Sequence, residues 1–118
     1  MNNMYRSFVD SRCKSGEDIL NEQTAEQAHL LHMAIGVAGE AGELLDAIKK
    51  HAIYQKDLDI ENVEEELGDL MFYMTGIMNI LRISNLDYII NKNQRKLKKR
   101  YPSGNYTNTQ AQTRADKE

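Results

Sequence analysis

Apolar residues recur every three or four positions along three long segments of the chain, which is the spacing of an amphipathic α-helix. The first segment opens with Thr24-Ala25-Glu26-Gln27, which has the form of a capping box, and the pattern persists to about Tyr54. Its apolar positions cover more than half of the helix circumference, so we expect this helix to be buried on several sides. They include Leu30, Met33, Val37, Leu44 and Ile48.

Two further core helices are expected after the first. Either Asp59 or Asn62 caps the second helix, whose apolar stripe runs to about Ile83. The third helix begins with the capping residues 84–87 and stops at Pro102, because proline cannot continue a helix.

The two ends of the chain are expected to be simpler than its middle. A short N-terminal helix, closed by Ser15-Gly16, precedes the core helices, and a polar tail that could be disordered starts at about residue 103.

No linker rich in proline, glycine or serine divides the 118 residues, so we expect residues 1–118 to form one domain. A single proline, six tyrosines, two phenylalanines and 28% charged residues favour an all-α fold over a sheet sandwich. We expect a bundle of three core helices plus the short N-terminal helix.

Cysteine content and hydropathy indicate the compartment. Cys13 is the single cysteine, so it cannot form an internal disulfide, and the first residues lack the pattern of a secretion signal. Charged residues interrupt every apolar run well before the length that spans a bilayer. We therefore expect a cytoplasmic protein without a membrane partner.

The net charge is only −3, but the charges are unevenly distributed. Acidic residues crowd positions 61–69 and basic residues crowd positions 92–100. Such a division suits a metal site at one place and an anion site at another. Charge alone favours the simpler interpretation, two solvated helix faces.

Two pairs of carboxylates stand at the border of the apolar stripes: Glu40 with Glu43, and Glu66 with Asp69. Members of each pair are three residues apart and lie on one helix face. Packing of the two helices could bring the four carboxylates close together. There they would repel each other and lose hydration, and a bound cation would compensate for both effects. All-oxygen ligands favour Mg²⁺ first and Mn²⁺ second. The alternative is that each pair only decorates the surface and forms salt bridges within its helix.

Glycines interrupt the same helix at Gly36, Gly39 and Gly42, and each costs about 1 kcal/mol relative to alanine. Gly36 lies one turn before Glu40, so its missing side chain could leave room for a ligand beside a metal. Close helix packing is the alternative explanation for each glycine.

The order and spacing of three motifs resemble the MazG-like nucleotide pyrophosphohydrolases, within the all-α NTP pyrophosphatases. GEAGELLDAIKK is similar to the ExxE helix of that family, EEELGDLMFYM to its ExxD helix, and NQRKLKKRYP to a segment of its compact members. The resemblance implies a helical bundle completed by oligomerisation, as a homodimer or homotetramer. It also implies hydrolysis of a (deoxy)nucleoside triphosphate to monophosphate and pyrophosphate with Mg²⁺. The implied catalytic residues and metal ligands are Glu40, Glu43, Glu66 and Asp69. A carboxylate that is not fully committed to the metal, either Glu43 or Glu66, could act as the general base.

Several other residues are candidates for substrate binding. On the third helix, Asn93, Lys96 and Arg100 form a stripe able to meet a triphosphate, where arginine offers a forked grip and lysine a point charge. A solvated surface charge or a structural role in the core is the alternative for each candidate. The remaining candidates are Tyr101, Lys56, Asn62, His32 and Tyr73.

Two other functions compete with the hydrolase. A di-iron carboxylate bundle needs two Glu-x-x-His motifs, and only residues 26–29 supply one. A non-enzymatic helical module could bind a nucleotide or nucleic acid through the basic third helix, although the acidic overall balance argues against nucleic acid as a partner.

Overall fold

The computed structural model of the chain describes residues 3–117, in which six α-helices and one 3₁₀-helix form and no strand is found. The expected all-α class is therefore confirmed. The described residues divide into two compact units, with the boundary between Met74 and Thr75.

The N-terminal segment contains two short helices, α1 (Asn3–Arg12) and α2 (Gly16–Glu22). The expected short N-terminal helix is α1, but it ends at Arg12, before Ser15-Gly16, and α2 was not expected. Ser15 instead caps α2, because its hydroxyl oxygen accepts a hydrogen bond from the Asp18 N–H at 3.0 Å. Serine followed by glycine is compatible with the end of one helix and with the start of the next.

Helix α3 (Ala25–Ala52) begins at the expected capping box. The Thr24 hydroxyl accepts from the Gln27 N–H at 3.1 Å, and the Thr24 N–H donates to the Gln27 side chain at 2.9 Å. A loop over residues 53–59 reverses the chain into α4 (Ile60–Ile80). Asp59, and not Asn62, caps α4 by accepting from the Asn62 N–H at 3.1 Å.

Helix α4 ends earlier than the expected Ile83. Arg82 adopts a left-handed backbone conformation with φ of 57°. Its N–H donates to the Asn79 carbonyl, and the Ile83 N–H donates to the Met78 carbonyl at 2.9 Å. This pair of bonds is a Schellman motif, which satisfies the last carbonyls of the helix.

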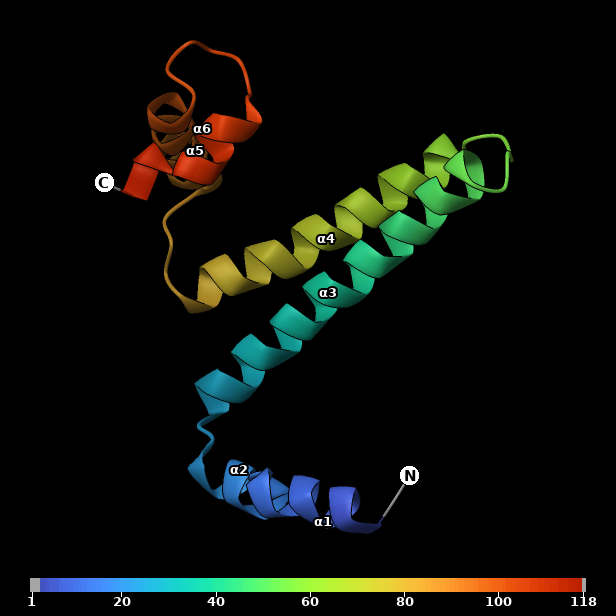
Figure 1. Cartoon of the computed structure of the whole chain (residues 1–118), viewed down its shortest axis with the longest axis vertical. Coiled ribbons are helices and arrows are strands. Elements are labelled where there is room, and N and C mark those ends of the chain that lie inside the picture. The colour runs from blue at the N-terminus through green and yellow to red at the C-terminus, as the bar shows by residue number, and fades with distance from the viewer. Residues whose placement is uncertain (1–2, 118) are drawn as a thin grey trace. The chain divides into compact units, whose positions relative to one another are not determined.

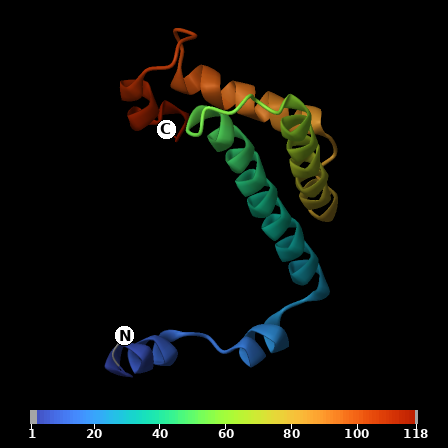
Figure 2. The ribbon, with the colours of Figure 1, turned by 90° about the vertical axis from the view of Figure 1, so that its right-hand side faces the viewer.

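Helices α3 and α4 run antiparallel and are joined at the loop (Figures 1 and 2). Their apolar faces are only partly covered within one chain. Among the described hydrophobic residues, only Met33 and Ala47 are buried, while Ile35 and Leu45 remain 61% and 67% exposed. The expectation that the first core helix is buried on several sides is therefore not met by a single chain.

The C-terminal unit contains α5 (Leu86–Arg100), α6 (Asn108–Thr113) and the 3₁₀-helix η1 (Ala115–Lys117). Asn85 caps α5 as expected, by accepting from the Tyr88 N–H at 3.0 Å. Both α6 and η1 fold back against α5, as Figures 1 and 2 show. The polar tail is therefore structured, which corrects the expectation of disorder. None of the described helices is long and apolar enough to cross a membrane.

Candidate active site

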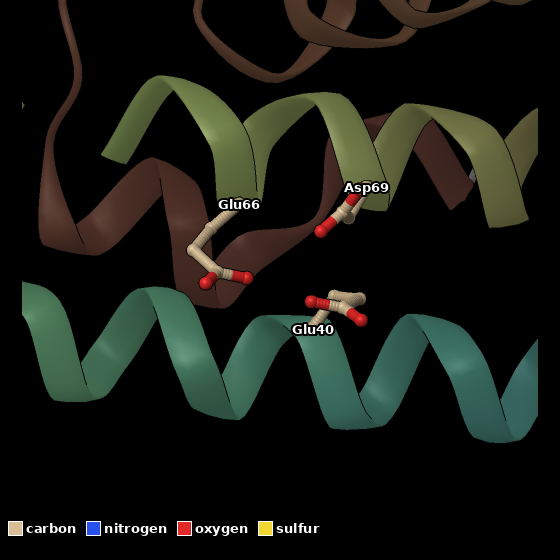
Figure 3. Close-up of side chains that lie close together, drawn as sticks. All are labelled: Glu40, Glu66 and Asp69. Carbon is tan, nitrogen blue, oxygen red and sulfur yellow. The ribbon is translucent and has the colours of Figure 1, made fainter. Parts of the chain in front are cut away.

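Three carboxylates meet between α3 and α4. One oxygen each from Glu40, Glu66 and Asp69 lie within 4.8 Å of one another. Figure 3 shows Glu40 on α3 facing Glu66 and Asp69 on α4. The two residues of α4 are three apart, so the helix presents both toward α3. Carboxylates from both helices therefore gather in one place.

Mutual proximity and partial burial both disfavour negative charge on the carboxylates of this cluster. Glu40 and Glu66 are half-buried, and Asp69 is exposed. Glu40 lies where it can accept a hydrogen bond from protonated Glu66. The pKa of Glu66 is raised to about 7 by this hydrogen bond, by the loss of hydration and by the surrounding negative charges. The fully buried Oε2 atom of Glu66 has no hydrogen-bond partner among the described residues.

An unsatisfied, buried carboxylate oxygen requires a partner, because leaving such an atom unpaired costs free energy. Two further carboxylates beside it add repulsion in place of compensation. A hard divalent cation satisfies both demands, and the donor set consists only of carboxylate oxygens. The residues present therefore fit a divalent metal ion.

Glu43 occupies a different environment from the three clustered carboxylates. Its side chain is exposed, and it is not among the residues whose oxygens lie within 4.8 Å of one another. Its negative charge is still close enough to contribute to the raised pKa of Glu66. One turn further, Asp46 forms an ion pair with Lys50 at 3.0 Å, one of the surface pairs that the sequence allows.

Gly36 of α3 lies in close contact with the ring of Tyr73 of α4. A Cβ atom added to Gly36 would lie 2.2 Å from Cδ1 of Tyr73 and 2.3 Å from its Cε1. The tyrosine ring therefore fills the space that the glycine leaves, so the idea that Gly36 keeps room for a ligand is wrong in this structure. Phe72 stands edge-on to the Tyr73 ring, with centroids 5.2 Å apart.

The remaining candidates of this unit lie outside the carboxylate cluster. His32 is exposed on α3. Lys56 lies in the loop, where its carbonyl oxygen is 2.9 Å from Nδ1 of His51. Asn62 is half-buried in the first turn of α4.

Two candidates of the C-terminal unit, Asn93 and Lys96, line one cavity of about 390 Å³ beside α5. The cavity also holds two further lysines and one carboxylate, so its lining is rich in positive charge. Its other lining residues are Ile89, Lys92, Asp116 and Lys117.

Arg100 and Tyr101 have partners within the C-terminal unit. The Arg100 guanidinium makes an ion pair with Asp116, with Nε 2.9 Å from Oδ1. Tyr101 is half-buried, and its ring centroid lies 5.3 Å from that of Tyr106. The role of Asp116 was missed in the sequence, because a partner sixteen residues away leaves no periodic signal.

Comparison with known proteins identifies one relationship. The family model for the MazG nucleotide pyrophosphohydrolase domain matches residues 27–104, a span that includes all four acidic candidates. Comparisons with curated proteins and with solved structures found no match.

Proposed function

Because the chain belongs to the MazG nucleotide pyrophosphohydrolase family, we propose that it hydrolyses a (deoxy)nucleoside triphosphate to the monophosphate and pyrophosphate with a divalent cation. Mg²⁺ is the first choice and Mn²⁺ the second, since both prefer oxygen ligands. The family supports nucleotide pyrophosphohydrolase activity in general.

One observation carries the proposal: carboxylate oxygens from two helices converge within 4.8 Å, and a buried oxygen of Glu66 lacks a partner. Glu40, Glu66 and Asp69 would hold the cation, with Glu43 as a fourth, outer carboxylate. A divalent cation there neutralises phosphate oxygens and makes a water molecule easier to deprotonate.

The chain itself supplies the proton acceptor for attack of water on the α-phosphorus. Without a cation the pKa of Glu66 is raised to about 7, and a bound cation would favour the charged form of Glu66, which can accept a proton. Glu43 is exposed and stands outside the three clustered carboxylates, so it is less committed to ligation. Either residue can therefore accept the proton from the attacking water.

Substrate binding is assigned to polar and aromatic residues around these elements. Asn93 and Lys96 line a cationic cavity of about 390 Å³, which favours phosphate groups. We extend the same role to the remaining candidates with the chemistry to contact a phosphate, a ribose or a base. These are Arg100, Tyr101, Lys56, Asn62, His32 and Tyr73.

Assembly into a homodimer or homotetramer is part of the proposal. Large apolar side chains stay in solvent on both α3 and α4, among them Leu45 and Phe72, each 67% exposed. Large exposed apolar side chains on a single chain often mark an interaction surface. A second copy that packs against these helices would supply the missing half of the core.

The experiment is incubation of the purified protein with each canonical and modified nucleoside triphosphate and Mg²⁺, followed by identification of the products. Monophosphate plus pyrophosphate supports attack on the α-phosphorus. Diphosphate plus orthophosphate contradicts it. Absence of hydrolysis together with salt-sensitive binding to DNA or RNA would favour the non-enzymatic module instead.

Variants tie the activity to the cluster. Glu40→Gln and Asp69→Asn should each reduce kcat by at least about a hundredfold, the scale expected when an electrostatic participant is removed from a transition state. Glu65→Gln is the matched control, because Glu65 is exposed and adjacent in sequence to a clustered residue. Wild-type rates in Asp69→Asn would remove that residue from the site.

A further inference from the structure

Asp116 is the most buried carboxylate for which an ion pair is found, with only 2% of its side chain exposed. Arg100 holds it with two hydrogen bonds, from Nε at 2.9 Å and from Nη2 at 3.3 Å. Arg114 approaches the same two oxygens at 3.4 Å. A forked guanidinium fixes the orientation of a carboxylate as well as its charge.

These contacts hold the end of the chain against α5. Arg114 adopts a left-handed conformation with φ of 55°, which ends α6 and turns the chain into η1. Non-glycine residues adopt this conformation uncommonly, so the surrounding contacts must maintain it. The ion pair of Arg100 with Asp116 is one such contact, and it joins residues sixteen positions apart.

The same contacts build one wall of the cavity beside α5. Asp116 and Lys117 come from η1, whereas Lys92, Asn93 and Lys96 come from α5. A carboxylate in this wall would repel an anion if it stood alone. The two guanidinium groups on Asp116 offset its charge, so the lysines make the cavity cationic.

We propose that Asp116 is a positioning residue: by holding Arg100 and Arg114 it folds η1 onto α5 and completes a basic pocket that grips the phosphate groups of the substrate. This inference rests on the proposed function for the identity of that substrate. It assigns a role to residues 107–117, which lie beyond the segment matched by the family model. The hydrogen bonds from Arg100 and Arg114 hold the pKa of Asp116 far below its usual range, so the contact persists at any physiological pH.

The test compares Asp116→Asn with the wild-type protein in two assays. Isothermal titration calorimetry with inorganic tripolyphosphate in the presence of EDTA reports on the basic pocket without a metal-dependent contribution from the acidic cluster. Steady-state kinetics on the best substrate, with Mg²⁺, separates KM from kcat. We expect about a tenfold loss of tripolyphosphate affinity and about a tenfold rise in KM, with kcat within about twofold, because the charge-assisted hydrogen bonds that hold Arg100 and Arg114 are weakened.

Three further variants sharpen the comparison. Asp116→Glu keeps the negative charge and should therefore bind tripolyphosphate more tightly than Asp116→Asn does. A role of Asp116 in chain stability alone does not require this difference. Lys117→Ala leaves the ion pairs intact but removes one ammonium group from the pocket, so it should also weaken tripolyphosphate binding. Glu22→Gln breaks an exposed ion pair with Lys14 and should change neither measurement.

Wild-type tripolyphosphate affinity in a folded Asp116→Asn variant would overturn the inference, and so would wild-type affinity in Lys117→Ala. If Asp116→Asn does not fold, Lys117→Ala decides alone. If the wild-type protein hydrolyses no nucleotide, the proposed function fails, and the tripolyphosphate titrations still decide whether Asp116 completes an anion pocket.

Discussion

The close contact between Gly36 and Tyr73 predicts that the substitution Gly36→Ala destabilises the protein. A methyl group at residue 36 would lie 2.2 to 2.4 Å from three ring atoms of Tyr73. Restoring an ordinary contact of 3.4 Å requires the ring or the helix to retreat by about 1.2 Å. The ring sits on a short stem, so a small rotation of a flexible chain end cannot relieve the clash.

Two opposing terms set the stability of Gly36→Ala. Alanine is favoured over glycine inside a helix by about 1 kcal/mol. Overpacking of a well-filled contact costs about 1 to 3 kcal/mol. The net expectation is a loss of up to about 2 kcal/mol. Glu40 and Asp69 lie one turn from the contact on the same two helices, so separation of α3 and α4 should also weaken metal binding.

The assay is urea denaturation at fixed protein concentration, with Gly68→Ala and Gly39→Ala as controls. A Cβ atom at either control position meets nothing within 4 Å among residues 3–117. Each control should therefore be stabilised by up to about 1 kcal/mol through helix propensity alone. If Gly36→Ala proves as stable as Gly68→Ala, the close approach of Tyr73 does not set the spacing of the two helices.

Three other outcomes are expected. Because the pKa of Glu66 is raised to about 7 in the folded protein, the stability it contributes is present below the unfolded value of about 4.5 and is lost as pH rises through 7. Denaturation in EDTA should therefore show decreasing stability over that window, and Glu66→Gln should remove the trend, whereas an unchanged trend in the variant would implicate another group. Thr24→Ala should cost about 1 kcal/mol in a denaturation assay, because the capping bonds of α3 are lost, and no loss would mean that water replaces them. Phe72→Asp should shift the protein to a smaller species in light scattering if its exposed ring lies in the proposed interface, and an unchanged mass would exclude Phe72 from it.

Local signals explain why most helices were predictable. Thr24 with Gln27 satisfies the first N–H groups of α3, and Asn85 does the same for α5. Both motifs act within three residues, so the sequence alone contains the whole interaction. Asp59 and Asn62 are both good capping residues, and only the loop conformation decides between them.

The missed features depend on contacts between distant residues. Nothing near Arg100 in the sequence indicates that Asp116 will meet it, and the polar composition of the tail hides a specific ion pair. Gly36 indicated a close approach, but its partner Tyr73 comes from another helix. Tertiary packing, not local propensity, determines both pairings.

Only part of the acidic site was predictable, because tertiary packing also determines which way its side chains point. Helical spacing placed Glu66 beside Asp69 on one face, and the structure turns both toward α3. Helical spacing also made Glu40 and Glu43 neighbours, but the rotation of α3 directs Glu40 toward α4 and leaves Glu43 exposed. The period of a helix gives the separation of two side chains, and only packing gives the direction of the helix face.

Direct measurement of Mn²⁺ binding by electron paramagnetic resonance tests the central claim, that the carboxylates of α3 and α4 jointly hold a divalent cation. The wild-type protein and Glu65→Gln should bind Mn²⁺ at one saturable class of site that Mg²⁺ displaces, while Glu40→Gln and Asp69→Asn, each from a different helix, should lose it. Retention of wild-type Mn²⁺ affinity in both cluster variants would contradict the account.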